Sequence, residues 1–86
     1  MAPILPSWFK QRQGKAEPAG TDTYRLYGPN LREAFLSVRR TDNAQWSAAL
    51  RYTADGPDAI TTQSPLPTEY DAWEAAFELY REEVIV

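Results

Sequence analysis

Hydrophobic and polar residues alternate with a period of two through the middle of the chain, from Thr21 onward. This alternation is typical of half-buried strands, because successive strand residues point to opposite faces of a sheet. Three segments carry it clearly, TYRLY, AFLSVRR and WSAALRYT, and a weaker one, AITTQ, follows. The turn signals GPN, TDNAQ and ADGPD separate these segments by short connections. The pattern therefore predicts an antiparallel meander of three to four strands.

The period changes near the C-terminus, where PTEYDAWEAAFELYREEVIV has its apolar residues at spacings of three and four. On a helix these residues form one narrow stripe, which consists of Tyr70, Trp73, Phe77, Tyr80 and Val84. Thr68, with Asp71 three positions later, has the form of a capping box. The helix is therefore expected to begin directly after Thr68.

An apolar sheet face and an apolar helix stripe each need a cover, and the simplest arrangement is that they cover one another. We expect Tyr70, Trp73 and Phe77 to pack on the sheet residues that point inward. Those residues are Leu36, Val38, Trp46, Leu50 and Tyr52. The predicted fold class is α+β, with a small antiparallel sheet packed on one C-terminal amphipathic helix. Residues 1–20 hold three of the seven prolines and are expected to form a partly flexible N-terminal arm, with residues 21–86 as the single domain.

The residue types that carry most enzyme chemistry are missing from the sequence. The chain contains no His and no Cys, which removes imidazole acid–base catalysis, thiolate nucleophiles and the usual zinc sites. None of its four glycines lies in a Gly-rich phosphate loop. We therefore expect a non-enzymatic domain without a metal or a small-molecule cofactor.

The same sequence features bear on the compartment. No stretch approaches the ~20 apolar residues that a membrane span requires. The start, MAPILPSWFK, has no basic stretch before its apolar residues, so it does not resemble a secretory signal. A chain without cysteine suits a reducing compartment. We expect a cytoplasmic protein that does not bind a membrane.

Charge is unevenly distributed along the chain, although the net charge is only −3. Residues 1–52 contain eight Lys and Arg against four Asp and Glu. Residues 53–86 contain one Arg against eight Asp and Glu. The sequence therefore predicts a basic sheet and N-terminal arm opposite an acidic helix, and a polyanion would approach only from the sheet side.

The strand residues that point away from the helix form the first candidate binding surface. They are Arg25, Tyr27, Phe35, Arg39 and Arg51. Arg and aromatic side chains together are enriched at protein interfaces, and they also bind nucleic acid by phosphate contact and base stacking. Two plainer interpretations stay open: these are ordinary solvated strand positions, or the N-terminal arm covers the rings.

A second candidate surface lies on the helix, away from its main stripe. It consists of Ala72, Ala75 and Leu79, which are bordered by acidic residues. Small side chains beside one Leu would let a second backbone approach closely. The alternative is that Leu79 is a single exposed apolar residue, which is common on protein surfaces.

Three antiparallel strands followed by a helix, with Trp46 opening the central strand and alanines in the helix, resemble two families of small DNA-binding domains. These are the domains of plant ethylene-response factors and of tyrosine-integrase arms. The resemblance covers roughly residues 34–82 and implies a sheet face that enters the major groove of DNA. Those domains are usually basic, whereas this chain is acidic with a pI near 4.8. The resemblance assigns the chain to no family.

Together these features favour a small non-enzymatic protein-interaction or regulatory module. Its partner is expected to be a protein, either another chain or a second copy, bound through the sheet face or the helix surface. The alternative is a nucleic-acid-binding domain that uses the outer sheet face and the basic N-terminal segment.

Overall fold

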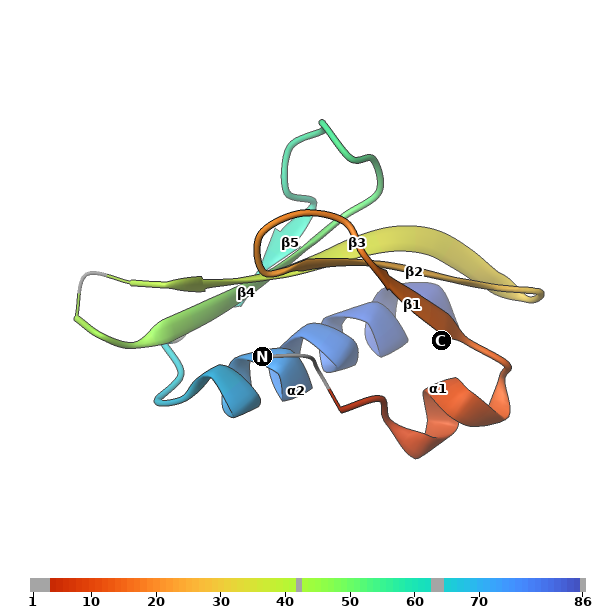
Figure 1. The fold of residues 1–86 in the computed structure, drawn as a ribbon, viewed down its shortest axis with the longest axis horizontal. Helices are drawn as coiled ribbons and strands as arrows, with labels where there is room; N and C mark the ends of the chain where they lie inside the picture. The colour runs from red at the N-terminus through yellow and green to blue at the C-terminus, as the bar shows by residue number, and fades with distance from the viewer. Residues whose placement is uncertain (1–3, 42, 63–64, 86) are drawn as a thin grey trace.

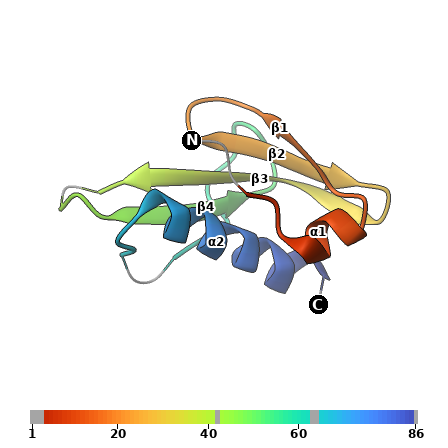
Figure 2. The same cartoon turned by 60° about the horizontal axis from the view of Figure 1, so that its bottom comes forward.

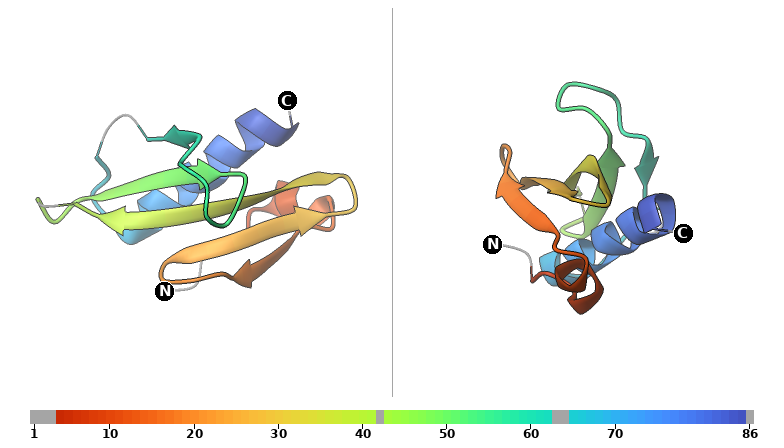
Figure 3. Two further views of the ribbon diagram at one scale, coloured as in Figure 1. Left: turned by 90° about the horizontal axis from the view of Figure 1, so that it is seen from above. Right: turned by 90° about the vertical axis from the view of Figure 1, so that its right-hand side faces the viewer.

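The computed structural model describes residues 4–41, 43–62 and 65–85. The elements in chain order are α1 (Ser7–Gln11), β1 (Lys15–Pro18), β2 (Thr23–Gly28), β3 (Leu31–Arg40), β4 (Trp46–Arg51), β5 (Ile60–Thr61), α2 (Glu69–Tyr80) and a π-helical turn, η1 (Arg81–Ile85). Figure 1 shows two layers, with the sheet above α1 and α2. The loop between β4 and β5 rises on the opposite side of the sheet from the helices (Figures 1 and 3).

The sheet is an antiparallel meander, because strands that follow one another along the chain are also neighbours in space. Across β3 and β4, Leu36 lies opposite Leu50 and Val38 opposite Ala48, and all four side chains belong to the core beneath the sheet. This arrangement confirms the predicted α+β class of an antiparallel sheet packed on a C-terminal helix. The described residues contain five strands rather than three to four.

α2 begins where the capping pattern predicts. The backbone N–H of Asp71 donates to Thr68 Oγ1 at 3.1 Å, and the Thr68 hydroxyl donates to Asp71 Oδ2 at 3.0 Å. The pair therefore satisfies a backbone donor of the first turn that has no partner inside the helix. The carboxylates of Glu69 and Asp71 also lie at the positive end of the helix dipole.

The buried face of α2 is rotated relative to the predicted stripe. It consists of Ala72, Trp73, Ala76, Phe77 and Tyr80. The small side chains of Ala72 and Ala76 belong to the core and leave room for the helix backbone to come close to β3 and β4. Tyr70 consequently lies on the flank of the helix, where it is 48% exposed. Its predicted place in the core is wrong.

α1 and β1 place much of residues 4–18 in the folded layers, which differs from the arm expected over residues 1–20; residues 1–3 of that arm lie outside the described residues. α1 lies beside the C-terminal half of α2 (Figure 2), and Phe9 is fully buried against Phe77 and Tyr80. β1 extends the sheet by pairing with β2. Gly14 is required in the connection between α1 and β1, because a Cβ there would lie 2.5 Å from the Phe9 ring.

Tyr80 joins the end of α2 to the sheet. Its ring is fully buried, and its hydroxyl donates to the backbone carbonyl of Arg32 on β3 at 2.7 Å. Burial raises the pKa of Tyr80 to about 12. The neutral phenol is therefore the form that the fold stabilises.

Candidate functional site

The five residues predicted on the outer face of the sheet lie on the side away from α2. Arg25 is opposite Phe35 on the neighbouring strand, and Phe35 is opposite Arg51 on the next, so the three form one row across β2, β3 and β4. Arg39 lies on the same face, further along β3, where it is opposite Ser47 of β4. The alternation of strand residues thus placed this set correctly, and its role in binding stays a prediction.

The charge of Arg25 is neutralised within the molecule. Its guanidinium is paired with Glu33 at 2.5 Å and with Glu17 at 3.6 Å, and it stacks 4.3 Å from the centre of the Tyr27 ring. The hydrogen bond to Glu33 raises the pKa of Arg25, and the hydrogen bond that Tyr27 donates to Glu17 raises the pKa of Tyr27. This corner of the outer face is a closed group of opposite charges around a ring.

Phe35 is not presented to solvent. It is only 8% exposed, and Ser37 and Ala49 beside it are also buried. Arg51 is half-buried, and its Nε is buried with no hydrogen-bond partner among the described residues. The centre of the outer face is therefore packed, and the expectation that Phe35 is available to a partner is corrected.

The second predicted surface, on α2, is only partly exposed. Ala72 is fully buried under the sheet, so its assignment to a partner face is wrong. Ala75 and Leu79 are half-buried, and Leu79 packs against the core. The cause is the rotation of the helix described above, which turns the line of alanines toward the sheet.

A different surface lies between the N-terminal segment and α2, and we call it the α2 groove. Its volume is about 210 Å³, and it is lined by Ile4, Leu5, Pro6, Trp8, Tyr70, Trp73, Glu74, Phe77 and Glu78. Ile4 is 71% exposed and Tyr70 48% exposed. These are the exposed large hydrophobic residues of the described part of the chain, and both line this groove.

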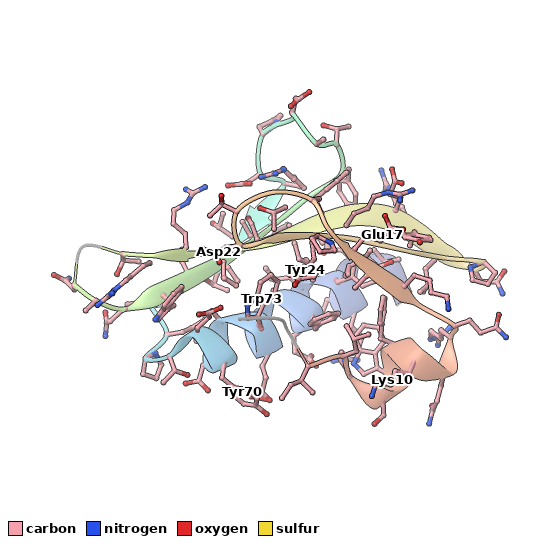
Figure 4. All side chains as sticks on the ribbon, in the orientation of Figure 1. Lys10, Glu17, Asp22, Tyr24, Tyr70 and Trp73 are labelled. Carbon is pink, nitrogen blue, oxygen red and sulfur yellow. The ribbon has the colours of Figure 1, made fainter. Side chains whose placement is uncertain are left out.

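The walls of the groove are held by the core. Trp8 stacks on Tyr80 with ring centres 6.4 Å apart and meets Phe77 edge-on at 6.4 Å. Trp73 packs edge-on against Tyr24 of β2 at 5.5 Å, and its indole N–H donates to Glu69 at 3.3 Å. Figure 4 shows Trp73 between the helix and the sheet, whereas Tyr70 points away from the sheet. The groove therefore has an aromatic floor that packs on the core.

The rim of the groove is acidic. Glu78 is paired with Arg81 at 2.8 Å, which raises the pKa of Arg81 through their hydrogen bonds. Glu74 has no hydrogen bond or ion pair within the described residues. No Lys or Arg is among the residues that line the groove. The groove thus combines exposed apolar surface with an uncompensated carboxylate.

Sequence reasoning did not find this groove, although its parts were visible. Ile4, Leu5 and Trp8 stand together in an apolar stretch, and Tyr70 follows the helix cap. Nothing in the sequence brings the two segments together, because they are separated by the whole sheet. The signal that does exist is the gathering of large apolar side chains in a segment that was expected to be a partly flexible arm.

Within the described ranges, no group of three or more acidic, His or Cys side chains is placed to hold a metal ion. In the same residues, no helix is long and apolar enough to cross a membrane. Comparison of the chain with known protein families, with curated proteins and with solved structures finds no match.

Proposed function

We propose that this chain is a small non-enzymatic protein-interaction module, of a regulatory or accessory kind, that holds a segment of a partner protein in the α2 groove. The observation that carries the proposal is the coincidence of Ile4 and Tyr70 at one hollow. Exposed apolar surface that gathers at a single concave place, with a polar rim, is typical of interaction sites. A cytoplasmic location suits a chain without cysteine.

The charge distribution weighs against the alternative of nucleic-acid binding. A phosphate backbone needs cations that are free to replace its counterions. Arg25 is engaged by two carboxylates, and Arg51 is half-buried. The acidic rim of the groove would repel phosphate.

The proposal is tested by selecting displayed random peptides on the wild-type protein and measuring their affinity for three matched variants. The groove variant is Ile4→Ser with Tyr70→Ser, the helix variant is Ala75→Ser with Leu79→Ser, and the sheet variant is Arg39→Gln with Arg51→Gln. We expect the selected peptides to lose affinity for the groove variant alone. Amide shifts in an NMR titration should then map to residues 4–8 and 70–78.

Two results would contradict the proposal. Peptides that lose affinity for the helix or sheet variant, and keep it for the groove variant, would place the binding surface elsewhere. Saturable binding of duplex or single-stranded oligonucleotide near physiological salt, lost in the sheet variant, would favour the nucleic-acid alternative. Circular dichroism of the three variants checks that each is folded.

A further inference from the structure

We propose that the group which the α2 groove recognises is an arginine side chain of the partner segment. This inference rests on the proposed function and specifies its ligand. Four of the nine residues that line the groove are aromatic and two are glutamates. Aromatic rings attract cations through their quadrupole, and a carboxylate adds direct charge attraction. A cation with an apolar stem matches both parts of this lining.

The two glutamates of the rim are not equivalent. Glu78 is already bound by Arg81, whose Nη2 lies 2.8 Å from Oε2. Glu74 is one helical turn earlier on the same side of α2 and has no such partner in the described residues. A guanidinium at Glu74 would continue a row of alternating charges along the helix. The structure therefore points to Glu74 as the position of the incoming cation.

The chain itself shows how it holds a guanidinium. Arg25 lies 4.3 Å over the ring of Tyr27 with carboxylates on either side, and Arg32 lies 3.9 Å over the ring of Tyr52. The groove offers the same kinds of group, since Tyr70 and Glu74 are spaced by one turn on α2. The Arg25 contact is therefore a direct precedent for a ring and a carboxylate that share one arginine, and the Arg32 contact is a precedent for the ring alone.

Arginine suits this site better than lysine for two reasons. Its guanidinium is planar, so it stacks on a ring and still binds a carboxylate through two parallel hydrogen bonds. It is also more weakly hydrated than an ammonium group and loses less on entering a hollow with apolar walls. Neighbouring apolar side chains of the partner would contact Ile4 and Leu5, which form the apolar side of the groove.

The test uses three capped peptides, acetyl-Ala-Leu-X-Leu-Ala-amide, in which X is Arg, Lys or norleucine. Each is titrated by NMR into the wild-type protein, into Glu74→Gln and into Glu82→Gln. Glu82 is an exposed acidic residue outside the groove lining, so its change alters net charge equally. We expect the Arg peptide to bind about tenfold more tightly than the norleucine peptide, with Lys between them. Glu74→Gln should abolish that difference, and Glu82→Gln should keep it.

Several outcomes would overturn the arginine assignment. Equal affinity of the Arg and norleucine peptides would make the groove a plain apolar site, while the proposed function would stand. Equal losses in Glu74→Gln and Glu82→Gln would show general charge attraction rather than a site. Concentration-dependent shifts of groove resonances in the protein alone would make a second copy the occupant. Absence of groove shifts with every peptide would also refute the assignment, and the peptide selection then decides the proposed function separately.

Discussion

The outer face of the sheet and the α2 groove contain the same kinds of side chain, aromatic rings beside charged groups. On the outer face, Arg25 is held by Glu17 and Glu33 over the Tyr27 ring, and Phe35 is buried. In the groove, Tyr70 is exposed and Glu74 has no partner within the described residues. The outer face therefore satisfies the charge of Arg25 and covers Phe35, whereas the groove leaves a ring and a carboxylate available.

Two surfaces of similar composition therefore differ in which of their groups are already engaged within the molecule. Arg and aromatic residues are enriched at interfaces, but a group that is already paired or buried offers less to a partner. An ion pair within the molecule, such as that of Arg25 with Glu33, stabilises the fold. A partner would have to break this ion pair before it could bind either side chain.

The largest effect is expected from the residue that anchors the groove wall to the core. Phe9→Ala should destabilise the protein by about 3–5 kcal/mol, the usual cost of deleting a buried large aromatic side chain. The loss in the free energy of unfolding is measured by urea titration, with tryptophan fluorescence as the signal. The neighbouring change Lys10→Ala removes an exposed side chain and serves as the control. A loss below about 1 kcal/mol for Phe9→Ala would mean that the N-terminal segment is dispensable, as an arm would be.

The next prediction compares the two regions directly. Phe35→Ala on the outer face should cost about 3 kcal/mol, because the ring is buried. Tyr70→Ala in the groove should cost less than about 1 kcal/mol, because nearly half of the side chain already contacts water. Thermal unfolding of the two variants gives the comparison. A larger loss of stability for Tyr70→Ala than for Phe35→Ala would contradict this prediction, because it would make Tyr70 the structural residue and Phe35 the available one.

Alkaline pH should weaken the junction between α2 and β3. The pKa of Tyr80 is about 12 in the folded protein and about 10 when unfolded, so the folded state keeps its proton longer. The stabilisation is complete below about pH 10 and is lost as pH rises toward 12, by up to about 2–3 kcal/mol. The free energy of unfolding, measured by urea titration at pH values from 8 to 12, should show this decline.

Tyr80→Phe supplies the control for the pH dependence. It removes the titrating hydroxyl and its hydrogen bond to Arg32, so we expect a loss of about 1 kcal/mol at neutral pH and a flatter alkaline limb. Tyr27→Phe should flatten the limb less, although the pKa of Tyr27 is also raised. An unchanged alkaline limb in Tyr80→Phe would contradict the assignment.

The smallest effect is expected at Arg51. Arg51→Met keeps an apolar stem and removes a buried Nε that has no partner in the described residues, so stability should change by less than about 1 kcal/mol. Arg51→Ala also removes the stem and should cost more. Chemical unfolding of both variants separates the contribution of the stem from that of the charge. Strong destabilisation by Arg51→Met would show that the guanidinium is itself a structural group of the outer face.

Local pattern was enough to predict most of the fold. The alternation through β2, β3 and β4 assigns most residues to a face, because a strand has a period of two, and it fails at Leu31, where the register of β2 and β3 shifts. The cap at Thr68 and the spacing of Trp73, Phe77 and Tyr80 predict α2 and most of its buried side. These features need only neighbours a few residues apart, so they can be read along the chain.

The tertiary structure alone decided β1, the orientation of α2 and the groove. β1 is a four-residue edge strand ending in Pro18, and its backbone pairing with β2 leaves little trace in side-chain pattern. The rotation of α2 depends on how closely Ala72 and Ala76 approach the sheet, which moves Tyr70 out of the core. The groove brings together Ile4 and Tyr70, which lie near opposite ends of the sequence. Packing determines such contacts between distant segments, because short-range periodicity specifies which side of an element is apolar and not what comes to cover it.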